Sequence, residues 1–178
     1  MLTAKYKKRI EQIALDLHQS FWSLKDNDYD LAEILNFIES LHGKVLFDQN
    51  ENKVTEKEIS LSFSNEQFFK ENEGNRLNLR EIFFHEVWHF LENTMDLDVD
   101  GDGGFTDIFS SSVSEMSAGY FSRAMLMPEK DFIESVIENT DIKGMCNVFG
   151  VAKKFKVDYT NVIGRGNDLN LWNMKVGI

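Results

Sequence analysis

The sequence predicts an α+β fold in which a helical bundle packs on a small, mostly antiparallel sheet, followed by a short helical C-terminal module. Apolar residues recur at helical spacing along most of the chain, whereas only two short stretches between residues 44 and 64 have the pattern of strands. With 178 residues, of which 42% are hydrophobic, the chain is long enough to bury a core. We therefore expect one domain over residues 1–178.

Two amphipathic helices are expected before residue 44. The first, over residues 3–25, has an apolar stripe formed by Tyr6, Ile10, Ile13, Ala14, Leu17, Phe21 and Leu24. The second follows a turn at residues 26–28 and has a stripe formed by Leu31, Ile34, Leu35, Ile38 and Leu41. Gly43 is expected to end this helix, because glycine readily adopts the left-handed conformation found after helix C-termini.

Two strands are expected next. Residues 44–48 form a short apolar run. Residues 58–64 alternate strictly, with Ile59, Leu61 and Phe63 on one face and serines on the other. This alternation is typical of a strand that is buried on one face and exposed on the other.

Residues 85–89 read HEVWH, within a segment over residues 77–92 that is apolar on most of its surface and should form a buried helix. Residues four apart lie on one face of a helix, so His85 and His89 can bind one metal ion and Glu86 can reach a water molecule beside it. This spacing is the signature of zinc metallopeptidases, in which the glutamate is the general base. The alternative is a pair of core histidines bonded to backbone groups, with Glu86 in a salt bridge.

The third metal ligand should be a carboxylate, because a catalytic zinc usually has three protein ligands and no histidine follows His89. The downstream candidates are Glu92, Asp96, Asp98, Asp100, Asp102, Asp107 and Glu115. We favour Glu115, because it opens a segment with helical spacing that should pack on the first helix; Asp107 is the second choice. Ser112 and Glu115 also form a capping box, so the glutamate could instead cap that helix, which Pro128 should end.

The two motifs together resemble the ImmA/IrrE family of zinc metallopeptidases. They are R-x-x-x-x-HExxH-x-L, from Arg80 to Leu91, and E-x-x-A-x-x-F-x-x-x-x-L-M-P, from Glu115 to Pro128. The resemblance covers about residues 28–172 and implies a zincin-like fold with a catalytic core over residues 28–128. It also implies that His85, His89 and Glu115 bind Zn²⁺ and that Glu86 is catalytic.

The resemblance further implies a substrate. Members of the family are usually described as site-specific endopeptidases that cleave helix-turn-helix repressors, often those of phages or other mobile elements. In peptidases of this general design, an edge strand beside the metal helix pairs with the extended substrate, and residues 58–64 are our candidate for that strand. An ordinary strand with one exposed face is the alternative.

The sequence departs from the family at several positions. A glycine usually precedes the second histidine, whereas here Val87 and Trp88 stand there, and the bulky Trp88 suggests a differently shaped wall beside the metal. Ser117 and Ser122 replace an acidic and a small residue of the family pattern.

Hydrolysis also needs a second donor to the oxyanion. Tyr120, Arg123 and Arg80 are the candidates for this role, and the sequence does not choose among them.

Residues 96–107 resemble a calcium loop, with acids at positions 1, 3 and 5, glycine at position 6 and a carboxylate at position 12. Position 12 is aspartate rather than the bidentate glutamate, and no clean helix pair flanks the loop. Ca²⁺ binding from Asp96 to Asp107 is therefore one interpretation. The other is a solvated loop at the mouth of the cleft that acts as a lid or selects basic substrates.

The C-terminal third should be helical. Residues 131–139 predict a helix with Phe132, Val136 and Ile137 inward. Residues 145–172 predict two short helices followed by a final strand, and they resemble a small helix-turn-helix. Only Lys153, Lys154, Lys156 and Arg165 would supply its basic face. We therefore favour a packing module over a DNA-binding regulator, which stays an alternative.

Composition excludes several classes of protein. A net charge of −11 argues against strong binding to nucleic acid. The chain shows neither a signal peptide nor an apolar run long enough to span a bilayer, so we expect no membrane association. The single cysteine, Cys146, excludes an internal disulfide and suits the cytoplasm. The sequence leaves the oligomeric state undetermined, and a non-catalytic regulatory protein on a zincin scaffold stays a further alternative.

Overall fold

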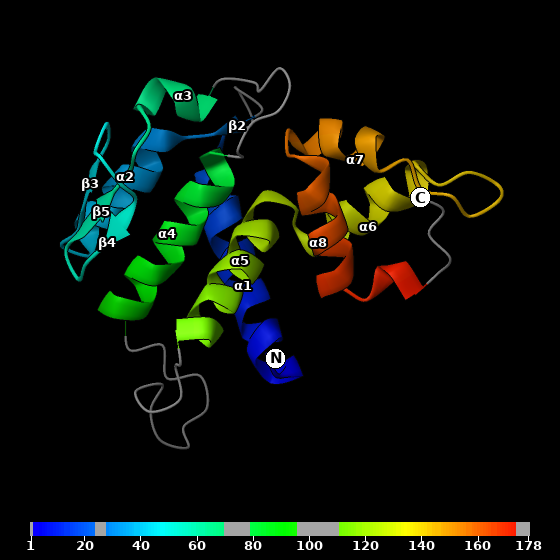
Figure 1. The fold of residues 1–178 in the computed structure, drawn as a ribbon, viewed down its shortest axis with the longest axis horizontal. Helices are drawn as coiled ribbons and strands as arrows, with labels where there is room; N and C mark the ends of the chain where they lie inside the picture. The colour runs from blue at the N-terminus through cyan, green and yellow to red at the C-terminus, as the bar shows by residue number, and fades with distance from the viewer. Residues whose placement is uncertain (1, 24–27, 70–78, 96–110, 174–178) are drawn as a thin grey trace.

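The computed structural model describes residues 2–23, 28–69, 79–95 and 111–173, and over these ranges the predicted α+β architecture is confirmed (Figure 1). The helices are α1 (Ala4–Phe21), α2 (Leu31–Ser40), α3 (Asn65–Phe69), α4 (Leu79–Thr94), α5 (Ser111–Leu126), α6 (Glu129–Glu138), α7 (Val148–Phe155), α8 (Tyr159–Asp168) and the 3₁₀ helix η2 (Leu171–Asn173). The strands are β1 (Trp22–Ser23), β2 (Asp28–Tyr29), β3 (Lys44–Leu46), β4 (Lys53–Val54) and β5 (Glu58–Ser60).

The first helix ends earlier than the apolar stripe predicts. It starts after Thr3, whose side chain accepts a hydrogen bond from the Tyr6 amide at 3.2 Å, and it stops at Phe21. After the helix, the Trp22 ring contacts Tyr29 of β2 edge-on and stacks on His18 within α1, both at 5.2 Å between centroids. β1 then pairs with β2. Tertiary packing overrides the helical pattern here.

Gly43 follows α2, as predicted, but the physical reason differs. The left-handed residue is His42, with φ of 62°, so Gly43 does not end the helix by its conformational freedom. Glycine is needed because the chain passes against Phe90 of α4: a Cβ atom at this position would lie 2.3 Å from the Phe90 Cζ. The junction between α2 and β3 is thereby packed directly on α4.

Replacing Gly43 by alanine should lower the free energy of unfolding by about 1–3 kcal/mol, the usual cost of overpacking a tight core. The Phe90 ring that the new methyl group meets is fully buried, so it has little space into which to move. Urea unfolding measures the effect. Gly119→Ala is the matched control, since its nearest neighbour is the flexible end of Arg123 at 3.4 Å. That control should be neutral or stabilising, because alanine favours helix. Equal losses in both variants would contradict the prediction.

The three-stranded sheet has the order β3-β5-β4, and a separate two-stranded sheet joins β1 and β2. The two strands that the sequence predicted, β3 and β5, pair parallel. β4, which the sequence did not predict, pairs antiparallel with β5, so the larger sheet is mixed. The strand predicted over residues 58–64 is shorter than expected, since β5 covers only Glu58–Ser60. The predicted buried face is confirmed, since Ile59, Leu61 and Phe63 are all buried.

The expectation that residues 58–64 form an edge strand is wrong. The strand over this segment, β5, is the central one, and β4 lies at the edge. The alternating pattern shows that one face of a strand is buried, but it carries no information about which strands lie on either side.

Helix α4 lies between the three-stranded sheet and α5, and α1 packs on the other side of α5 (Figure 1). This position explains why α4 is apolar over most of its surface, as the sequence predicted for residues 77–92, of which the structure describes 79–92. Its fully or nearly fully buried side chains are Phe83, Phe84, Val87, Trp88, Phe90 and Leu91. Among the described ranges, no helix is both long enough and apolar enough to cross a bilayer.

The two short helices predicted in the tail are confirmed as α7 and α8, but residues 171–173 form a 3₁₀ turn instead of a strand. In α6 the residues Phe132 and Val136 face inward, whereas Ile137 is 68% exposed.

The basic residues of the tail contact the rest of the chain. Arg165, counted above toward a basic face, is fully buried and donates to Glu11 of α1 at 2.8 Å. Lys154 and Lys156 form ion pairs with Glu138 and Asp28. These contacts tie the module to the bundle and favour the packing role.

Candidate metal centre

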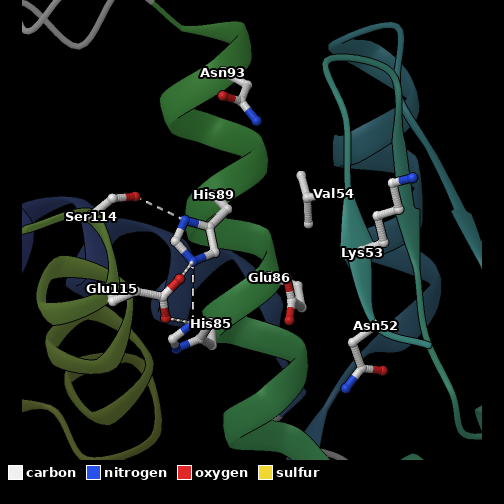
Figure 2. Close-up of a pocket in the computed structure, with 9 residues that line it drawn as sticks. All are labelled: Asn52, Lys53, Val54, His85, Glu86, His89, Asn93, Ser114 and Glu115. Carbon is white, nitrogen blue, oxygen red and sulfur yellow. Dashed lines mark hydrogen bonds and ion pairs between the residues drawn. The ribbon is translucent and has the colours of Figure 1, made fainter. Parts of the chain in front are cut away.

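Helices α4 and α5 bring three metal-ligating side chains together at one pocket (Figure 2). The Nε2 atoms of His85 and His89 are 3.1 Å apart. The carboxylate of Glu115 lies 3.1 Å from the Nε2 of His85 and 3.4 Å from the Nε2 of His89. Ligand atoms of a tetrahedral zinc, each about 2.0–2.2 Å from the ion, are themselves about 3.3–3.5 Å apart. The observed separations of 3.1 to 3.4 Å are close to this spacing, so the group could hold a metal ion.

The position of Glu115 contradicts the capping alternative. Helix α5 starts at Ser111, so Ser112 and Glu115 both lie inside it and the capping box does not form at its start. The Glu115 side chain points from α5 toward the two histidines of α4 (Figure 2). Asp107, the second choice, lies outside the described residues, as does the whole acidic segment over residues 96–107 with its possible calcium site.

Glu86 lies on the side of α4 that faces β4, across the pocket from Glu115 (Figure 2). Burial raises the pKa of its carboxyl group above the ordinary value, and nearby His89 partly offsets this. A carboxylate with a raised pKa is a stronger base than one in free solution. The group is thus suited to accept a proton at neutral pH.

The ring nitrogens of His89 face two different partners. While Nε2 points toward His85 and Glu115, Nδ1 lies 3.3 Å from Glu92 Oε2 and 3.1 Å from Ser114 Oγ. Burial by itself would lower the pKa of His89, but its hydrogen bond to Glu92 and the charge of that carboxylate raise it. The pKa of His85 is lowered, chiefly by burial.

Glu92 is held in turn by two further donors. The indole Nε1 of Trp88 donates to its Oε1, and the Ser114 hydroxyl donates to its Oε2, both at 2.6 Å. We call Trp88, Glu92 and Ser114 the Glu92 cluster. Glu92 was among the candidate ligands, and in the structure it contacts the opposite nitrogen of the histidine instead. Sequence reasoning did not find the cluster, because Ser114 comes from another helix.

The sequence suggested that the bulky Trp88 forms part of the pocket wall beside the metal, but it does not. Its side chain is fully buried on the face of α4 turned to α5, where its ring lies 4.8 Å from that of Phe121. It is absent from the residues that line the pocket. The Trp88 side chain therefore fills the space between the two helices and does not narrow the pocket.

The pocket has a volume of about 440 Å³. It is lined by Asn52, Lys53, Val54, His85, Glu86, His89, Asn93, Ser114 and Glu115. The sequence analysis missed the contributions of β4 and of Asn93. Asn93 could have been found, because it follows His89 by four residues and so extends the face that carries both histidines.

The three candidate oxyanion donors lie elsewhere. Arg80 is buried and donates to Asp28 at 2.8 Å, and Arg123 donates to Asp168 at 2.7 Å. Tyr120 is buried, with Lys7 and Arg165 close to its ring. None of them is among the residues that line the pocket.

Comparison of the chain with protein-family models, with curated proteins and with solved structures gave no match.

Proposed function

We propose that this protein is a zinc-dependent endopeptidase of the ImmA/IrrE type, whose metal is bound by His85, His89 and Glu115. One observation carries the proposal: three donor atoms from two helices meet at coordinating separations, with the partly buried Glu86 on the same pocket. Two imidazole nitrogens and one carboxylate are also the donor set that catalytic zinc sites use. A pair of ordinary core histidines would not require the exposed carboxylate of Glu115 beside them.

Zinc held there would polarise the scissile carbonyl and acidify a water molecule. Glu86 takes a proton from the attacking water and later passes it to the leaving amine. Its position beside β4 fits this role, because the substrate would have to lie between that strand and α4. Its raised pKa makes both the acceptance and the return of the proton possible near neutral pH.

The edge strand β4, rather than β5, is the proposed binding element for an extended substrate segment. Asn52, Lys53 and Val54 line the pocket opposite α4, and an edge strand can pair with a peptide through its backbone. From the resemblance, we propose that the substrate is a repressor with a helix-turn-helix domain and that it is cut at a specific site.

Incubation of the zinc-loaded protein with candidate repressors tests the proposal. Cleavage should stop when zinc is removed by a chelator and return when zinc is restored. The Glu86→Gln variant should be inactive under the same conditions. Equal cleavage by both proteins would exclude the proposed peptidase, and zinc binding without any cleavage would favour a non-catalytic protein on the same scaffold.

A further inference from the structure

Groups that contact the Nδ1 atom of His89 hold its ring so that Nε2 faces the other candidate ligands, and of these groups only Ser114 also lines the pocket. We propose that the Glu92 cluster is a positioning device for His89, and that Glu92 controls how tightly the centre binds zinc. The inference rests on the metal binding in the proposed function, but not on peptidase activity. Glu92 is thus a positioning residue, since it acts through the histidine.

The hydrogen bonds of the cluster determine which nitrogen of His89 is free. An ionised carboxylate only accepts hydrogen bonds, so the Nδ1 atom that faces Glu92 must carry the hydrogen. The neutral ring then leaves its Nε2 lone pair for the metal. Ser114 supports the same tautomer, because its hydroxyl hydrogen is directed to Glu92 at 2.6 Å and its oxygen is left to accept from Nδ1 at 3.1 Å.

The cluster also sets the spacing of the two helices that carry the ligands. Glu92 belongs to α4 and Ser114 to α5, and Ser114 is the residue directly before the third ligand, Glu115. The hydrogen bond from Ser114 to Glu92 therefore holds the Glu115 segment beside the histidines. Trp88 adds a second link, because its indole donates to Glu92 while its ring packs on Phe121 of α5.

The burial of Glu92 makes its hydrogen bonds necessary. Only 12% of its side chain is exposed, and a carboxylate in such a place is costly unless donors surround it. Its donors are the indole, the hydroxyl and the imidazole, and two of these come from the metal helix itself. If the Glu92 side chain loses one acceptor oxygen, one of these donors is left without a partner or the His89 ring must turn.

The Glu92→Gln variant tests the inference. Its side chain has nearly the same size but offers only one acceptor oxygen, so His89 should lose its fixed orientation. We expect zinc affinity, measured by competition with a chromophoric chelator, to fall by about 10–100-fold. The visible absorption spectrum of the cobalt-substituted protein should change as well, because it reports the geometry around the metal. Glu58→Gln is the matched control: Glu58 accepts from Lys44 and Ser60 but does not line the pocket.

A second variant keeps the test decisive if Glu92→Gln folds poorly. Ser114→Ala should weaken zinc binding in the same direction but less, whereas Ser122→Ala, whose hydroxyl bonds within α5 to Gly119, should not. The losses in the Glu92→Gln/Ser114→Ala double variant should be less than additive, because both residues act on one nitrogen.

Wild-type zinc affinity and an unchanged cobalt spectrum in Glu92→Gln would overturn the inference. The same holds if Glu58→Gln loses as much affinity. These measurements need no substrate, so they test the inference even if the protein cleaves nothing. A protein that binds zinc but cleaves nothing would contradict only the peptidase proposal. A wild-type protein that binds neither zinc nor cobalt would overturn both.

Discussion

The Glu86→Gln variant is expected to retain its zinc and to lose hydrolysis by about 10²–10⁴-fold, the range that a positioned general base contributes. Glutamine has the shape of glutamate but cannot take the proton of the attacking water. The atoms of His85, His89 and Glu115 that could hold the metal are untouched by the change. The loss should therefore appear in kcat rather than in metal content.

Two measurements show whether the loss of activity comes instead from lost zinc or from a destabilised fold. Elemental analysis should find equal zinc in the variant and the wild type, and the unfolding midpoints should agree closely, because Glu86 is only partly buried. Glu58→Gln, a glutamate of the sheet outside the pocket, is the control for the chemical change and should cleave normally. A Glu86→Gln protein with full activity would end the proposed mechanism.

The second large effect is expected at Glu115. Replacing it by alanine leaves two histidines from one helix to hold the metal, and zinc affinity should fall by more than the roughly 100-fold that marks the upper end for losing an outer partner of a ligand. The side chain is 63% exposed, so its removal should cost the metal-free fold little. The effect should thus be confined to the metal-loaded state.

Thermal unfolding with and without zinc measures this difference. A ligand that binds only the folded state adds about 2.7 kcal/mol of stability at a concentration 100 times its Kd. The wild type should be stabilised by zinc in this way, while Glu115→Ala should show almost no response at the same concentration. Met116→Ala, an exposed neighbour on α5, is the control and should respond like the wild type. An undiminished response in Glu115→Ala would point to another third ligand.

Some features were readable from the sequence because their cause is local. The pairing of His85 with His89 follows from the rise and turn of a single helix, whatever surrounds it. The same holds for the burial of Ile59, Leu61 and Phe63, which the alternation of apolar residues along one extended segment specifies. Helices α1, α2, α4 and α5 were predicted because each has an apolar face that repeats at helical spacing.

Other features depend on elements that are distant in the chain. The approach of Glu115 to the histidines requires α5 to pack on α4, and the hydrogen bonds of Glu92 require Ser114 from that same helix. The edge position of β4 depends on the order of the strands, which no strand encodes by itself.

The sequence by itself determined the elements and the two histidines that share a helix face, because spacing along one helix or strand fixes which side chains lie together. The tertiary structure alone decided three matters: which acid joins them, why Gly43 must be glycine against Phe90, and that Trp88 faces α5 instead of the pocket. Each of these depends on the distance between two elements, and that distance is set by packing across the core rather than by neighbours in the chain.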